Sequence, residues 1–218
     1  MIKTLLIALS FLSTMGLAQA GVLLQEDFID VRNLPGQGWV LDNQSVPPGV
    51  APGWVQGNPL VLPAQSRPRD SYIASDFNVA GEDGQVDNRL FTPLFSLENG
   101  AVATFYLRSA NTPGFGDIVV YGYTEGSTDP MEFIAEMVAT PPNEWTLYTI
   151  TIGAQAGNGR LGFVHRQDQA TADYVGLDTL LVVSNEAQVP EPASLMIFGL
   201  GLAGLSLARR RRRLLPAD

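Results

Sequence analysis

The sequence predicts an all-β protein built as an antiparallel β-sandwich, with a signal peptide before it and a short transmembrane helix after it. Three observations support this prediction: short runs of alternating apolar and polar residues, turn clusters rich in glycine and proline between those runs, and an apolar stretch at each end of the 218-residue chain. No convincing helical periodicity runs through the central region, so we expect no large helical domain.

The expected strands lie in the central part of the chain. The clear runs are 102–109, 117–123, 145–152, 160–165 and 174–183. A further run, 131–139, carries Glu132 and Glu136 at a spacing that also suits a helix. Pro130 and Pro141 bracket this run closely, so we predict a strand there as well.

Residues 33–69 form a different kind of segment, with proline or glycine every few positions. This pattern predicts a long, loop-rich passage with short strands, and such passages often carry binding sites. Trp39 and Trp54 are its expected anchors. The alternative interpretation is that both tryptophans plug one end of the core.

The N-terminus has the three parts of a secretory signal peptide. Lys3 supplies a positive charge, residues 5–12 are an apolar core, and Ala18 and Ala20 form an A-x-A cleavage site. The mature chain is therefore expected to begin at Gly21.

The C-terminus carries a second targeting pattern. The triplet Pro190, Glu191, Pro192 precedes an apolar stretch at 193–208, which Arg209, Arg210, Arg211, Arg212 and Arg213 close. Sixteen helical residues span about 24 Å, against about 30 Å for a hydrocarbon core, so the helix is short for a permanent anchor. The arginines are expected to stay on the cytoplasmic side as a membrane stop.

This tail resembles the PEP-CTERM sorting signal of exported bacterial proteins. The resemblance implies recognition by an exosortase, a membrane protease, followed by transfer from the inner membrane to the cell surface or extracellular matrix. An ordinary membrane anchor is the alternative. The expected organisation is a signal peptide at 1–20, a sandwich domain at 21–184, a linker at 185–189 and the sorting tail at 190–213.

Charge and composition exclude several functions. Of thirteen Lys and Arg, only seven lie between residues 21 and 189, whereas twenty of the twenty-two acidic residues lie there. A segment this acidic repels nucleic acid, so no nucleic-acid partner is expected. The chain has no cysteine and one histidine, which leaves no thiol catalysis or cysteine-based zinc site. We expect His165 at the surface or at a strand end, because no G-x-S-x-G nucleophile elbow accompanies it.

The central domain shows a second resemblance, carried by an ordered set of short motifs. The set comprises Glu26-Asp27-Phe28, Ala64-Gln65-Ser66, Asp70-Ser71-Tyr72-Ile73-Ala74, Arg89-Leu90-Phe91-Thr92-Pro93, Gly159-Arg160-Leu161-Gly162-Phe163 and Asp173-Tyr174-Val175-Gly176-Leu177-Asp178. In this order they resemble choice-of-anchor J domains, which are similar to cleaved-adhesin and MAM-like jelly rolls. The resemblance implies a jelly-roll β-sandwich with an adhesive or matrix role.

One candidate site is a structural calcium, although no cofactor is required. Glu26, Asp27 and Asp178 offer the oxygen ligands that calcium prefers, and related jelly rolls commonly hold calcium between the first and last strands. The alternative is that these carboxylates cap turns or accept backbone hydrogen bonds. Another acidic group, Glu82, Asp83 and Asp87, lacks ligand spacing and is expected in a solvated loop.

The other candidate site is a platform for sugar rings made by Trp39, Trp54 or Tyr72, which requires an exposed ring. The predicted function is that of an exported, non-catalytic surface or matrix protein, structural or adhesive and associated with exopolysaccharide. A carbohydrate-binding module is the first alternative. A glycoside hydrolase is the second, and it would need two carboxylates facing each other across a sugar cleft.

Overall fold

The computed structural model describes residues 21–124, 129 and 132–185. The signal peptide with Ala18 and Ala20, the triplet at 190–192 and the arginines at 209–213 lie outside these residues, and their roles stay predictions. In the part of the chain that the structure describes, no helix has the length and apolar character needed to cross a bilayer.

The described residues form strands joined by turns and three short 3-10 helices. The strands are β1 (Val22–Glu26), β2 (Val40–Asn43), β3 (Val46–Pro48), β4 (Val55–Gln56), β5 (Ile73–Asp76), β6 (Ala80–Phe91), β7 (Phe95–Ser96), β8 (Ala101–Ser109), β9 (Val119–Thr124), β10 (Phe133–Ala139), β11 (Thr146–Ile152), β12 (Asn158–Gly159), β13 (Leu161–Asp168) and β14 (Tyr174–Ser184). The 3-10 helices are η1 (Val31–Asn33), η2 (Pro35–Gln37) and η3 (Phe77–Val79).

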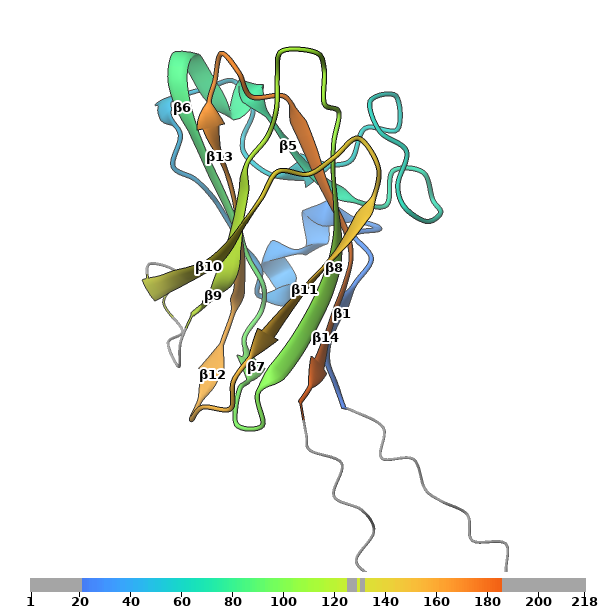
Figure 1. Cartoon of the computed structure of the whole chain (residues 1–218), viewed down its shortest axis with the longest axis vertical. Coiled ribbons are helices and arrows are strands. Elements are labelled where there is room, and N and C mark those ends of the chain that lie inside the picture. The colour runs from blue at the N-terminus through green and yellow to red at the C-terminus, as the bar shows by residue number, and fades with distance from the viewer. Residues whose placement is uncertain (1–20, 125–128, 130–131, 186–218) are drawn as a thin grey trace, which may run out of the picture. The chain divides into compact units, whose positions relative to one another are not determined.

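Two antiparallel sheets of six strands face each other (Figure 1). The first has the order β11-β8-β14-β5-β4, with β1 also paired to β14. The second has the order β10-β9-β13-β6-β2, with β3 also paired to β6, and β7 and β12 form a small separate ladder. Most neighbours in the two sheets, such as β8 and β14 or β6 and β13, are far apart in sequence, which is the topology of a jelly-roll sandwich and confirms the predicted fold class.

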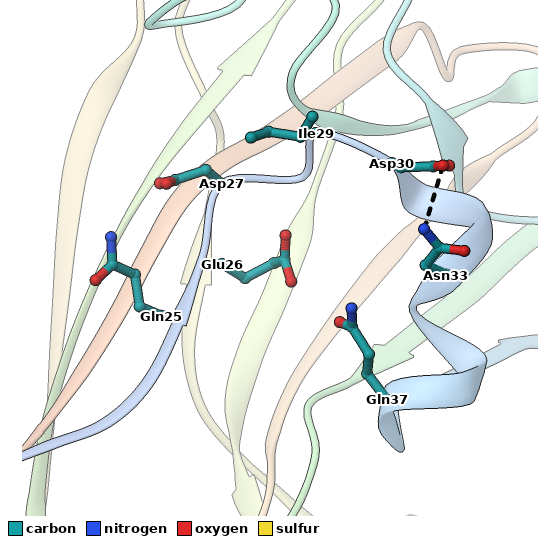
Figure 2. Close-up of a pocket in the computed structure, with 7 residues that line it drawn as sticks. All are labelled: Gln25, Glu26, Asp27, Ile29, Asp30, Asn33 and Gln37. Atoms are coloured by element: carbon teal, nitrogen blue, oxygen red, sulfur yellow. Dashed lines mark hydrogen bonds between the residues drawn. The ribbon is translucent and has the colours of Figure 1, made fainter.

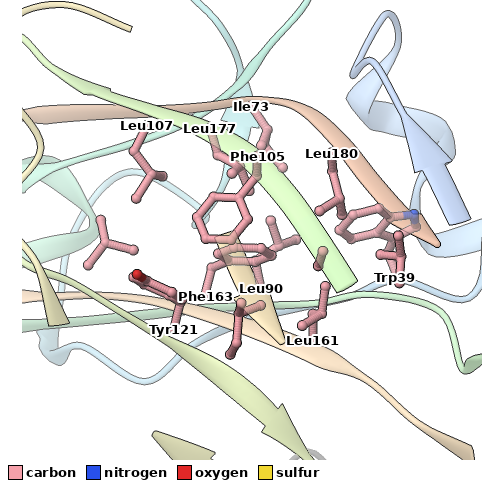
Figure 3. Packing of buried hydrophobic residues seen from close by; sticks show 14 of the residues in the cluster. Trp39, Ile73, Leu90, Phe105, Leu107, Tyr121, Leu161, Phe163, Leu177 and Leu180 are labelled. Carbon is pink, nitrogen blue, oxygen red and sulfur yellow. The ribbon is translucent and has the colours of Figure 1, made fainter. Parts of the chain in front are cut away.

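The core lies between the two sheets and follows from strict alternation along the central strands. In β8, every second residue from Ala101 to Ser109 is buried. Phe105 packs edge-to-face against Tyr121 and Phe163 of the opposite sheet, with ring centroids 5.0 and 4.9 Å apart (Figure 3). Burying a ring of this size contributes about 1.5 to 3 kcal/mol, so this aromatic cluster is a main source of sheet-to-sheet cohesion.

Each of the six expected strand runs contains a strand. The ambiguous run 131–139 holds β10, so its expected strand is confirmed. The acidic group was misjudged: Glu82, Asp83 and Asp87 lie within β6, a strand of twelve residues, instead of a solvated loop. From Gly84 to Leu90 the buried positions alternate with Gln85, Asp87 and Arg89, whereas Glu82 and Asp83 are both exposed and interrupt this alternation.

Candidate functional site

A surface pocket lies where β1 ends and the chain turns into η1 and η2 (Figure 2). Its volume is about 590 Å³. It is lined by three carboxylates, three carboxamides and one apolar side chain: Gln25, Glu26, Asp27, Ile29, Asp30, Asn33 and Gln37. A volume in this range accommodates a small ligand or a short piece of a polymer.

The strand end next to the pocket has a strained backbone held by a carboxylate. Phe28 has a φ of 51°, in the left-handed region that non-glycine residues rarely adopt. The Glu26 Oε1 atom accepts a hydrogen bond of 2.7 Å from the Phe28 backbone N–H, and the Phe28 ring packs edge-to-face on Trp39. These contacts fix the turn that directs β1 into the 3-10 helices, and so they fix the pocket wall.

Two carboxyl groups of the pocket, those of Glu26 and Asp30, have pKa values shifted in opposite directions. Burial raises the pKa of Glu26, and the nearby charge of Asp27 adds to this effect. By contrast, the hydrogen bond from the Arg32 side chain lowers the pKa of Asp30. Both Asp30 oxygens already accept hydrogen bonds from Arg32, and Asn33 Nδ2 donates a further one to Oδ2. Asp30 therefore serves first as the cap of η1.

Of the three predicted calcium ligands, Glu26 and Asp178 are engaged in other hydrogen bonds. β1 pairs with β14, as expected for first and last strands, and Glu26 lies opposite Leu180. The Asp178 side chain is fully buried, and its two oxygens accept hydrogen bonds from Gln65 N–H and from the Thr179 hydroxyl. In the described residues, no three histidine or acidic side chains form a group that could hold a metal. The calcium site therefore has no geometric support and stays a prediction.

The aromatic platform prediction is wrong, because all three rings are core residues. The exposed fractions of Trp39, Trp54 and Tyr72 are 4%, 3% and 0%. Trp54 Nε1 donates to the Asn88 carbonyl, and the Tyr72 hydroxyl lies 2.8 Å from the carbonyl oxygens of Asn58 and Leu62. The loop-rich passage folds over these rings, so its aromatic residues anchor loops and leave none of the three as a stacking surface.

A buried polar network that the sequence did not reveal links the two sheets. His165 of β13 is fully buried instead of lying at the surface. Its Nδ1 atom lies 2.9 Å from the Ser75 hydroxyl of β5, and its Nε2 atom lies 2.9 Å from Asp117 Oδ1. Asp117 Oδ2 accepts a hydrogen bond from the Ser109 hydroxyl at the end of β8.

This network contains the residue types of a catalytic triad, a serine, a histidine and an aspartate, but its role is structural. The exposed fraction of each of Ser75, Asp117 and His165 is at most 1%, so a substrate has no access to the Ser75 hydroxyl. That hydroxyl also accepts a hydrogen bond from Asn88 Nδ2. Burial acts to raise the pKa of Asp117, but hydrogen bonds and the charge attraction of His165 outweigh it, so the pKa lies below its ordinary value.

Most residues that line the pocket were not predicted from the sequence. Glu26 and Asp27 were identified as candidate ligands, whereas Asp30, Asn33 and Gln37 were not. One signal was available: Asp30 precedes a short Val-Arg-Asn segment, and Asx side chains favour turns and helix caps. The convergence of this turn with the end of β1 depends on the fold.

Comparison with known proteins gives a motif and a fold. Residues 188–213 match the PEP-CTERM protein-sorting motif. The K1 cleaved adhesin domain of Lys-gingipain from Porphyromonas gingivalis W83 is similar in structure, with a TM-score of 0.56 and 23% identity over 76% of this chain and 99% of that domain. The K3 domain gives 0.56 and 19% identity over the same shares. A search of curated protein sequences found no match.

These findings agree with the two resemblances read from the sequence. The sorting motif marks the chain as an exported, exosortase-sorted surface protein. The structural neighbours place its domain in the same fold as cleaved adhesin domains, and at this level of identity they define the fold alone.

Proposed function

We propose that this chain is a non-catalytic, adhesive component of the cell surface or extracellular matrix that binds a neutral polysaccharide through the pocket at the end of β1. The observation that carries the proposal is the lining of this pocket, which combines carboxylates with carboxamides around a single apolar side chain. This lining suits a ligand dense in hydroxyl groups.

The recognition chemistry follows from the donors and acceptors present. Carboxylates accept hydrogen bonds from sugar hydroxyls, while carboxamides such as Asn33 and Gln37 can both donate and accept. Ile29 is 65% exposed and provides an apolar surface for the C–H face of a sugar ring. Binding sites of this kind use a few convergent polar groups to fix the orientation of the ligand.

Charge selects the class of polysaccharide. Glu26, Asp27 and Asp30 place a negative potential in the pocket, and the chain as a whole has a net charge of −9. Uronic acid or sulfated polymers would bring like charges together, which costs affinity. A neutral polymer avoids this cost, so we assign the pocket to neutral exopolysaccharide.

The carboxylates of the pocket favour binding over hydrolysis. A glycoside hydrolase needs one free acid and one free base or nucleophile on either side of the scissile bond. Asp30 is engaged by Arg32, and Glu26 holds the Phe28 backbone. The proposal needs no metal, and the exosortase acts on the tail instead of the sandwich.

The test is a glycan array followed by titration calorimetry on the processed chain, with and without calcium. We expect binding to neutral polysaccharides, and loss of one hydrogen bond in Gln37→Ala or Asn33→Ala should weaken it about five-fold to ten-fold. Asn158→Ala, at an exposed position on β12, is the matched control and should bind normally. The proposal would be refuted if the protein bound none of the neutral glycans, or if it hydrolysed them and released reducing ends during incubation.

A further inference from the structure

Within residues 21–124, 129 and 132–185, the strand β11 is a sheet edge that carries no proline, bulge or charge. Its one partner there is β8, with which it pairs over all its residues in unbroken register. In the described part of the chain, no backbone hydrogen bond is recorded from β11 to any other element. Its sequence, Thr-Leu-Tyr-Thr-Ile-Thr-Ile, contains no charge, proline or glycine.

The other sheet edges carry devices that prevent strand addition. β1 and β10 each have a register irregularity, and β3 contains two prolines. β4 has only two residues, and β2 has four residues and carries the charge of Asp42. Short strands, prolines and bulges are the means by which proteins block edge pairing. By this standard β11 is the exception among these edges, and a long uncharged edge is a template for another strand.

The side chains of β11 divide between core and surface in a way that suits pairing. Ile150 and Ile152 are buried in the core and hold the strand in place. On the outer face Leu147, Thr149 and Thr151 are exposed, Leu147 by 53%. Cross-strand contacts among threonine and aliphatic side chains stabilise sheets.

We propose that β11 pairs antiparallel with β11 of a second copy of this chain, about a two-fold axis at Thr149, and joins the two copies into one continuous sheet. Thr149 is the central residue of the strand, so this register pairs every residue of β11. Leu147 then lies opposite Thr151 of the partner subunit, and the contact is isologous.

Charge favours a second copy as the occupant. The chain is acidic, so most faces of two copies repel each other, whereas this strand brings no like charges together. The nearest charged residue, Glu144, falls opposite Ala154 of the partner subunit in the same register. The pairing does not involve the pocket at the end of β1, so the two proposals stand or fall separately.

Single-cysteine cross-linking of the full chain in membranes tests the register, because the natural sequence contains no cysteine. Thr149→Cys should form a disulfide-linked dimer under mild oxidation, since facing residues on paired strands lie about 5 Å apart. Thr151→Cys is the matched control: its two copies would lie about 13 Å apart along the strands and should not cross-link. Equal cross-linking of both variants, or of neither, would overturn the register.

Analytical ultracentrifugation of the full chain in detergent tests the contact itself. The unmodified chain and Thr149→Val should be dimeric. Thr149→Lys and Thr149→Glu place like charges opposite each other and should raise the dimer dissociation constant at least ten-fold, with unchanged circular dichroism. The tail is the same in every variant, so a dimer that survives both charges arises elsewhere and refutes the proposal. A monomeric unmodified chain refutes it as well.

Discussion

The imidazole of His165 and the carboxylate of Asp117 form a buried pair, with Nε2 2.9 Å from Oδ1 and both side chains almost completely excluded from solvent. His165 lies in one sheet and contacts Ser75 of the other, while Asp117 accepts a hydrogen bond from Ser109 of that same other sheet. The pair therefore links the two sheets through hydrogen bonds. A buried pair of this kind is costly to break, because the remaining partner is left without compensation.

Asp117→Asn should lower the free energy of unfolding at pH 7 by about 3 kcal/mol. The pKa of Asp117 is lowered in the folded protein, so its contribution is present above the unfolded value of about 3.9 and is lost as the pH falls through the folded pKa. Urea unfolding at several pH values should show the difference between the two proteins shrinking in acid. Asp83→Asn, at an exposed position, is the control, and a pH-independent difference would contradict the assignment.

Tyr72→Phe should destabilise the protein by about 1 to 3 kcal/mol without changing polysaccharide binding, because the Tyr72 hydroxyl is the donor to the Asn58 and Leu62 carbonyls. Thermal unfolding and the glycan titration together check this outcome. Tyr106→Phe, on the half-buried face of β8, should leave both measurements unchanged. A loss of polysaccharide binding in a fully folded Tyr72→Phe variant would contradict this prediction and show that Tyr72 takes part in binding.

Glu26→Gln should slightly stabilise the protein at neutral pH. The folded pKa of Glu26 is raised by burial, so its favourable contribution is present in acid and is lost as the pH rises through that pKa. The amide keeps an acceptor for the Phe28 N–H. Because the site is partly open to solvent, we expect a gain below about 1 kcal/mol at pH 7 and none below about pH 4. Chemical unfolding at both pH values measures it, and a loss at pH 7 would show that the charge itself is needed.

Surface-exposed protein should begin at Gly21 and lack the arginines at 209–213, as intact mass measurement will show. Glu191→Ala, within the sorting triplet, should retain the full tail and stay in the membrane fraction. Asp218→Ala, outside the matched motif, should be processed normally. Recovery of uncut chain from the cytosol would contradict the export prediction.

Local patterns predicted six of the fourteen strands found in the described residues, and the reason is visible in β8 and β11. In both strands one face is buried and the other is more exposed. The apolar and polar residues therefore alternate with a period of two, which can be recognised in the sequence. The strand β6 was not predicted because Glu82 and Asp83 are consecutive exposed acidic residues, which interrupt its alternating pattern and resemble a loop. The platform hypothesis failed, and the alternative that both tryptophans lie in the core is correct, because exposure depends on what covers a residue. Trp54 contacts Asn88, and Tyr72 contacts Trp145 and Tyr174, all of which are distant in sequence.

The sequence by itself determined the sorting motif at 188–213, the acidic character and the all-β class, since these depend on composition, order and short-range periodicity. Tertiary structure alone decided the buried tie of Ser75, His165 and Asp117, the pocket between β1 and η2, and the open edge of β11. Each of these depends on which strands become neighbours. Most of these neighbours lie far apart along the chain, so only the folded sandwich brings their side chains together or, among the described residues, leaves one edge of β11 unpaired.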